Sequence, residues 1–283
     1  MAKQKREVEV VVLSDIHLGT YGCHAKELVA YLKSVSPKVL ILNGDVIDGW
    51  AFSKRYFPNS HMAVLSEFFK MMKKGTQVIY ITGNHDEFLR KYTDLSMGNL
   101  FLTDKYLLEI EGKKHWIFHG DVFDHTTSGS AKFIAKLGGM GYDWLILVNR
   151  AINWILEKFG KGKVSLSKKV KNSVKKAVKF IGDFEKKATE IAINNHYDYV
   201  ICGHIHQPAD KIWTTEKGSV HYLNSGDWIE NLSWLEFDKG NWNLKFFKEK
   251  DFEKPIIEKN DISVNMEELI HPKILASFAE VKI

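Results

Sequence analysis

The stretch VEVVVLSDIH, residues 8–17, decides the fold. Its apolar run is rich in β-branched residues, as buried strands are, and it closes on the polar side chains Asp15 and His17. Two later stretches repeat this design, VLILNGD at 39–45 and VIYITGNHD at 78–86. Each has an apolar run followed by Asp, Asn or His. The repetition predicts three buried strands whose ends carry chemically active side chains.

Segments with helical periodicity separate these strands, at 25–35 and 62–73. This β-α-β-α-β order predicts parallel strands covered by helices, with ligands collecting beyond the carboxyl ends of the strands. We therefore expect the three polar ends to meet at one edge of a sheet. Further apolar runs predict more strands and a second sheet, at 106–110, 115–119, 199–202, 219–223, 232–237 and 242–247.

Composition indicates a globular intracellular protein. The 283 residues are 45% hydrophobic, enough for one large domain spanning 1–283. The two cysteines, Cys23 and Cys202, have no paired spacing, which excludes a disulfide framework and a cysteine zinc site. A few charged residues run directly into the strand-like segment 8–13, so secretion is not expected, and the lack of a run of about eighteen apolar residues argues against a spanning helix. The predicted location is the cytoplasm.

Residues 126–190 differ in charge from the rest of the chain. They hold fourteen Lys or Arg against five acids, whereas the whole chain has a net charge of only +5. Apolar residues recur there at helical spacing, so we predict a helical insertion in the domain. The Lys-rich face comprises Lys168, Lys169, Lys171, Lys175, Lys176, Lys179, Lys186 and Lys187, and the apolar stripe includes Trp144, Trp154 and Phe159.

This combination of charge and apolar surface suits a lipid phosphate at a membrane surface. It favours peripheral contact with the inner face of the membrane through 126–190. The alternative is a solvated charged helix packed on the core by its apolar side.

Five short motifs contain residue types that bind divalent cations. They are Asp15-Ile16-His17, Asn43-Gly44-Asp45, Gly83-Asn84-His85-Asp86, His119-Gly120-Asp121 and Gly203-His204-Ile205-His206. Asp15 and His17 have the same parity and are expected on one side of an extended strand end. The two oxygens of Asp45 suit it to bridge two cations.

Carboxylate, imidazole and amide ligands suit Mn²⁺, Fe²⁺, Zn²⁺ or Co²⁺, and two such ions about 4 Å apart bind the attacking and leaving oxygens of phosphoryl transfer. We predict two divalent ions, with Mn²⁺ preferred. The remaining histidines lack this context and are expected to be ordinary: His24, His61, His115, His125, His196, His221 and His271.

The order of the motifs resembles that of the calcineurin-like metallophosphoesterase superfamily, over 8–125 and 198–247. The resemblance implies an α/β fold, a four-layer α-β-β-α sandwich, with a helical lid insertion at about 126–190. It implies that one cation is held by Asp15, His17, Asp45 and His206, and the other by Asp45, Asn84, His119 and His204. It further implies that Asn84 and His85 face the transferring phosphoryl group, with Asp48 orienting His85 as an acid.

A closer resemblance is to the UDP-2,3-diacylglucosamine pyrophosphohydrolases of lipid A synthesis. These enzymes have a helical lid at the same place and a Gly-Asp-Trp element like that in NSGDW at 224–228. The implied reaction is hydrolysis of UDP-2,3-diacylglucosamine to UMP and 2,3-diacylglucosamine 1-phosphate. Members of that family have Arg where this chain has His85, and a histidine there also serves alkoxide leaving groups.

A phosphodiesterase, nuclease or phosphomonoesterase on the same fold is therefore the alternative, with the basic insertion gripping a phosphate backbone in the nuclease case. A non-catalytic scaffold would have lost ligands, and none is missing. The predicted partner is a phosphorylated small molecule or lipid rather than nucleic acid. Nothing in the sequence predicts a protein partner.

Overall fold

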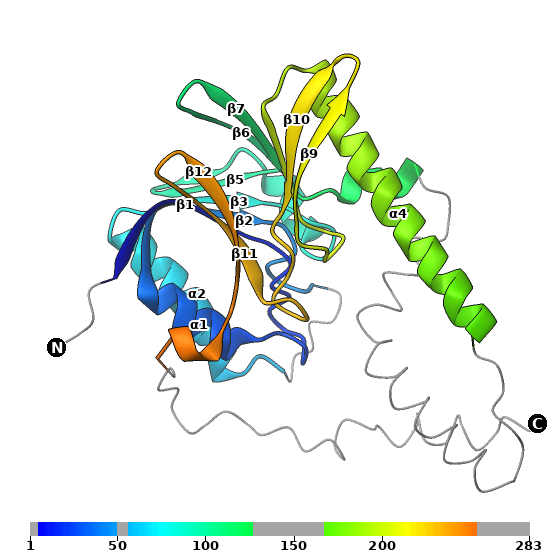
Figure 1. Ribbon diagram of the computed structural model, residues 1–283. Coiled ribbons are helices and arrows are strands. Elements are labelled where there is room, and N and C mark those ends of the chain that lie inside the picture. The colour runs from blue at the N-terminus through cyan, green and yellow to red at the C-terminus, as the bar shows by residue number, and fades with distance from the viewer. Residues whose placement is uncertain (1–4, 50–55, 127–166, 254–283) are drawn as a thin grey trace, which may run out of the picture.

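The computed structural model describes residues 5–49, 56–126 and 167–253 (Figure 1). In these ranges the chain forms two sheets flanked by helices. The first sheet has the order β12-β11-β1-β2-β3-β5-β4, and the second has the order β6-β7-β8-β10-β9.

The elements of the first sheet and its helices are β1 (Arg6–Leu13), α1 (Ala25–Ser34), β2 (Val35–Asn43), α2 (Asn59–Lys73), β3 (Gln77–Ile81), β4 (Ser96–Met97), β5 (Leu100–Thr103), β11 (Ser233–Asp238) and β12 (Asn241–Phe246). Those of the second are β6 (Lys105–Ile110), β7 (Lys113–Phe118), α4 (Ser167–Asn194), β8 (Tyr199–Cys202), β9 (Ala209–Thr215) and β10 (Gly218–Asn224). Three short 3-10 helices complete the described chain, η1 (Glu87–Tyr92), η2 (Asp121–Thr126) and η3 (Glu249–Asp251).

The predicted β-α-β-α-β order is confirmed, since β1, β2 and β3 pair in parallel. Three strands were not predicted, β4, β5 and β9. The two-residue β4 pairs antiparallel with β5. β5 extends the parallel sheet, and β9 is an edge strand with mostly exposed side chains, which leaves little hydrophobic signal in its sequence. The last two strands return to the first sheet, where β11 pairs antiparallel with β1.

Three apolar interfaces separate four layers, so the predicted α-β-β-α sandwich is confirmed. On β1, Val11 and Leu13 belong to the cluster that packs with α1 and α2, whereas Val10 and Val12 belong to the cluster between the sheets. A third cluster joins the second sheet to α4 through residues such as Phe184. Figure 1 shows α1 and α2 under one sheet and α4 beside β9 and β10.

The predicted insertion lies partly in α4. From Phe184 onward this helix buries one face on the second sheet, with Ala188 and Ala192 fully buried. Residues 127–166, which include Trp144, Trp154 and Phe159, lie outside the described residues, so the lid and its boundaries stay predictions. Within the described chain, no helix is long and apolar enough to cross a membrane.

Backbone hydrogen bonds tie together the loops at one edge of the sandwich. Asp15 N donates to Gly44 O at 3.1 Å, and His17 N donates to Asp45 O at 2.9 Å. In the second sheet, Gly203 N donates to the carbonyl of His119 at 3.0 Å. His204 N also donates to Asp15 Oδ2 at 3.0 Å, which connects the loops of the second sheet with those of the first and brings the motif residues together.

Candidate metal centre

Five of the predicted ligands have left-handed backbone conformations. The φ angles are 51° at Asp15, 53° at His17, 52° at Asp45, 68° at His204 and 51° at His206. The expected extended strand end at Asp15 and His17 is therefore wrong, because β1 already ends at Leu13. Positive φ is uncommon outside glycine, and its clustering on potential ligands is typical of strain retained at a functional site.

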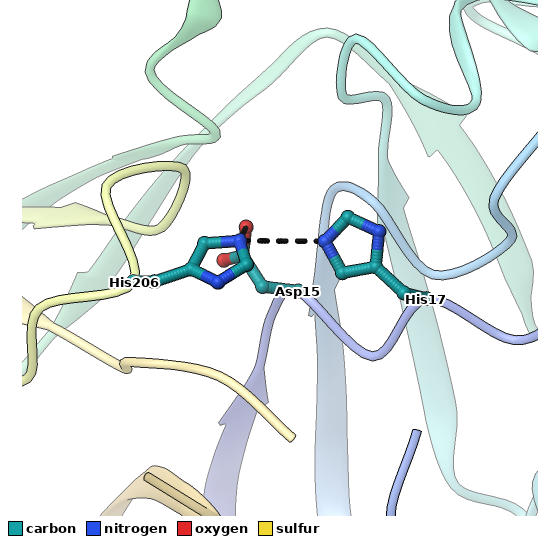
Figure 2. A group of neighbouring side chains, drawn as sticks. All are labelled: Asp15, His17 and His206. Atoms are coloured by element: carbon teal, nitrogen blue, oxygen red, sulfur yellow. Dashed lines mark hydrogen bonds and ion pairs between the residues drawn. The ribbon is translucent and has the colours of Figure 1, made fainter. Parts of the chain in front are cut away.

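Asp15, His17 and His206 form a first group that could hold a metal ion (Figure 2). The Nε2 atoms of His17 and His206 face each other at 3.4 Å, and Asp15 Oδ1 lies 3.2 Å from His206 Nε2. Two imidazole nitrogens and a carboxylate oxygen thus converge on one point. Such a convergence fits a divalent transition-metal ion.

Asp45, His119 and His204 form a second group of this kind. His119 Nδ1 lies 2.9 Å from the carbonyl of Asn43, which places the proton on Nδ1 and leaves Nε2 as an electron-pair donor. That Nε2 lies 3.2 Å from Asp45 Oδ2. The amide oxygen of Asn84 is buried and has no hydrogen-bond partner among the described residues, as expected of an atom that ligates an ion.

The Asp45 carboxylate lies between the two groups. Its Oδ2 is 3.2 Å from His119 Nε2 in the second group and 3.9 Å from His17 Nε2 in the first. Its Oδ1 accepts a hydrogen bond from His85 N at 2.8 Å. A Cβ added at Gly83 would collide with this carboxylate, so only glycine permits the close approach.

Asp48 contacts two histidines of the site. Its Oδ2 lies 3.0 Å from His85 Nδ1 and 3.2 Å from His17 Nδ1. The structure thus brings Asp48 next to His85, whose predicted roles as a pair stay a prediction, and it adds a contact with His17 that the sequence did not indicate. Burial lowers the pKa of His85, but Asp48 and Asp45 outweigh it and raise this pKa above its usual value.

Mutual electrostatic stabilisation of the carboxylates and imidazoles is strong in the metal-free chain. Burial opposes ionisation of Asp15, but His206 and His119 outweigh it and lower the pKa of Asp15 to about 2. Partial burial opposes protonation of His206, but Asp15 raises the pKa of His206 to about 9. Asp45 and Asp15 likewise raise the pKa of the buried His119 well above its usual value. His206 is therefore protonated at neutral pH when no cation is bound, and the same carboxylates favour the protonated form of His119.

Asp86, the last residue of the Gly-Asn-His-Asp motif, supports the loops instead of joining either metal group. Its carboxylate accepts hydrogen bonds from Val46 N at 2.9 Å, Gly83 N at 2.6 Å and the Tyr80 hydroxyl at 2.6 Å. It thus fixes the turn after β3 against the loop that carries Asp45.

The NSGDW segment supports the first group. Trp228 N donates to the carbonyl of Asp15 at 3.1 Å, and the buried Asp227 accepts four hydrogen bonds from the turn at 229–231. Within that turn, Asn231 Nδ2 donates to the carbonyl of His206 at 2.9 Å. The sequence singled out this segment only through its resemblance to the Gly-Asp-Trp element of the family. That resemblance did not predict which residues the segment contacts.

His61 is a further supporting residue that was expected to be ordinary. It is buried in α2, and its Nδ1 accepts a hydrogen bond from Gly19 N at 2.9 Å. It therefore fixes the loop that follows His17.

The chain belongs to the calcineurin-like phosphoesterases, because the model of that family matches residues 8–208. It is a metal-dependent phosphoester hydrolase of the α/β class.

The chain is 23% identical over 239 residues to a UDP-2,3-diacylglucosamine hydrolase of Aliivibrio fischeri, covering 83% of this chain and 97% of the relative. It is 31% identical over 144 residues to a DNA polymerase II small subunit of Thermoplasma acidophilum, covering 42% of this chain and 30% of that subunit. Among solved structures, a predicted phosphoesterase from Streptococcus pneumoniae is 14% identical, covers 88% of this chain and 93% of that chain, and has a TM-score of 0.36.

Metal binding is expected to release protons. Cations need neutral imidazoles, whereas His206, with a pKa of about 9, is protonated in the metal-free chain at pH 7.5, and the raised pKa of His119 favours its protonated form. Affinity should therefore rise with pH until these groups deprotonate. Calorimetric titration with Mn²⁺ in buffers of different ionisation enthalpy measures the released protons. Uptake without proton release at pH 7.5 would contradict the electrostatic description.

Proposed function

We propose that the chain is a binuclear hydrolase that cleaves UDP-2,3-diacylglucosamine to UMP and 2,3-diacylglucosamine 1-phosphate. The observation that supports the binuclear site best is the place of Asp45, whose Oδ2 lies within 3.9 Å of histidine nitrogens from both groups. In this proposal one cation is bound by Asp15, His17, Asp45 and His206, and the other by Asp45, Asn84, His119 and His204. Mn²⁺ is the proposed ion, with Fe²⁺, Zn²⁺ and Co²⁺ as acceptable replacements for this ligand set.

Two cations bound by these residues would supply positive charge for the phosphate oxygens and would lower the pKa of water. The chain's own residues provide orientation and proton transfer. Asp45 holds the two ligand groups together, and His119 is fixed in one tautomer by the Asn43 carbonyl. The reaction adds the oxygen of water to the uridine-side phosphorus and breaks its bond to the bridging oxygen, which leaves with the sugar phosphate.

His85 is proposed as the acid that faces the leaving group. Its Nδ1 lies 3.0 Å from Asp48, so its Nε2 is directed toward the site, 4.0 Å from Asp45 Oδ2. A sugar-phosphate leaving group needs little protonation, whereas an alkoxide needs more. His85 therefore also suits ordinary monoesters and diesters, which are the alternative substrates.

The lipid substrate is supported by similarity and by the sequence. The Aliivibrio fischeri relative that bears this activity in its name is matched over nearly its whole length. The basic, apolar segment 126–190 suits an acylated phosphate, and we propose that it meets the inner face of the membrane from the cytoplasm. The similarity to a DNA polymerase subunit keeps a nucleic-acid phosphodiester as the second candidate.

Replacement of Asp45 tests the binuclear assignment. We expect Asp45→Ala to lower phosphodiester hydrolysis at least about a hundredfold, because it removes a group on which transition-state stabilisation depends. The matched control is Asp210→Ala, which removes a carboxylate that pairs with His221 outside the site and should leave activity unchanged. Activity is measured with Mn²⁺ after circular dichroism has established folding. Full activity of metal-stripped Asp45→Ala protein would refute the mechanism.

Substrate preference tests the lipid assignment. UDP-2,3-diacylglucosamine should be hydrolysed faster than an aryl phosphodiester, and in ¹⁸O-labelled water the label should appear in UMP. Mass spectrometry of the products measures both quantities, with short DNA as a parallel substrate. Equal rates on the lipid and the aryl diester, or label in the sugar phosphate, would exclude the proposed reaction.

A further inference from the structure

Arg90 joins three parts of the chain next to the proposed metal centre. It lies in η1, five residues after His85, and its Nη2 is 2.6 Å from Asp121 Oδ2. Its Nε donates to the Thr82 hydroxyl at 3.3 Å and lies 3.5 Å from Asp104 Oδ1. One planar guanidinium therefore contacts the end of β3, the turn between β5 and β6, and the start of η2.

Two of these contacts flank proposed ligands of the same cation. Thr82 lies two residues before Asn84, and Asp121 lies two residues after His119. The Asp121 side chain is only 9% exposed, so its charge needs a close partner. Arg90 supplies that partner in a charge-assisted hydrogen bond, which is among the stronger contacts between side chains.

The first cation has different supports. The carbonyls of Asp15 and His206 accept hydrogen bonds from Trp228 N and Asn231 Nδ2, respectively, and both donors belong to the loop between β10 and β11. Ser14 reinforces that link through contacts with Ser225 Oγ at 2.7 Å and the Gly226 carbonyl at 2.9 Å. Hydrogen bonds such as His17 N to Asp45 O also join the two halves of the centre, but the contacts of Arg90 flank ligands of the second cation and not those of the first.

We propose that Arg90 is a positioning residue for the cation of Asn84 and His119, which it serves by fixing the distance between the loops that carry these ligands. This inference rests on the proposed assignment of both residues to one cation. Lysine cannot replace Arg90 fully, because a single ammonium cannot reproduce the planar geometry that reaches Asp121 and Thr82 together. The role differs from catalysis, since Arg90 acts through Asn84 and His119.

Calorimetric titration of the metal-free, full-length protein with Mn²⁺ tests this role. Wild type should take up two ions, and Asn84→Ala identifies the binding event of the second. In Arg90→Met we expect affinity for that ion to fall about 10–100-fold, as for other residues that orient ligands, with the first ion unaffected. Arg90→Lys should give an intermediate loss.

The control is Arg6→Met. Arg6 likewise pairs with a buried carboxylate, that of Glu236, at 2.9 and 2.6 Å, but it lies at the opposite end of β1 from Asp15. Its loss should lower the melting temperature without changing affinity for either ion. The inference is overturned if Arg90→Met binds the second ion as tightly as wild type, or if Arg6→Met weakens it equally.

If Arg90→Met fails to fold, the affinity of Arg90→Lys for the second ion is the test. Wild-type affinity in that variant overturns the inference. Failure of the binuclear assignment itself would be recognised separately, by uptake of fewer than two ions in wild type.

Discussion

Two buried carboxylates, Asp15 and Asp45, are the constraint on which the rest of the structure depends. Both side chains are at most 2% exposed, and burial of an unpaired charge costs several kcal/mol. Imidazoles and backbone N–H groups surround both carboxylates and offset this cost. His85 N and His204 N donate to Asp45 and Asp15, respectively. The sandwich provides the rigid edge at which these loops can meet.

The sequence predicted the fold and the members of the site more fully than it predicted their conformation. Buried parallel strands have long β-branched runs, so β1, β2 and β3 were recognisable, and their polar ends indicated one edge. No sequence pattern predicted the left-handed backbone of residues such as Asp15 and His206, because alternating Asp and His also fits an extended strand. The exposed edge strand β9 was missed because it lacks apolar periodicity.

The supporting contacts were not predictable because they join residues far apart in the chain. Asp86 reaches back 40 residues to Val46, and Asn231 reaches 25 residues to the carbonyl of His206. Arg90 reaches 31 residues forward to Asp121. A motif identifies which side chains can bind a cation, whereas the residues that orient them become visible only when the sheets have assembled. For this reason the sequence assigned no role to Asp86, whereas the structure shows that its carboxylate supports the loops around Asp45.

The most direct test of the binuclear centre is an anomalous difference map from crystals grown with Mn²⁺. The predicted result is two peaks about 4 Å apart on either side of the Asp45 carboxylate, one next to His17 and His206 and the other next to His119 and His204. A single peak, or a peak among His17, Asp48 and His85, would contradict the account.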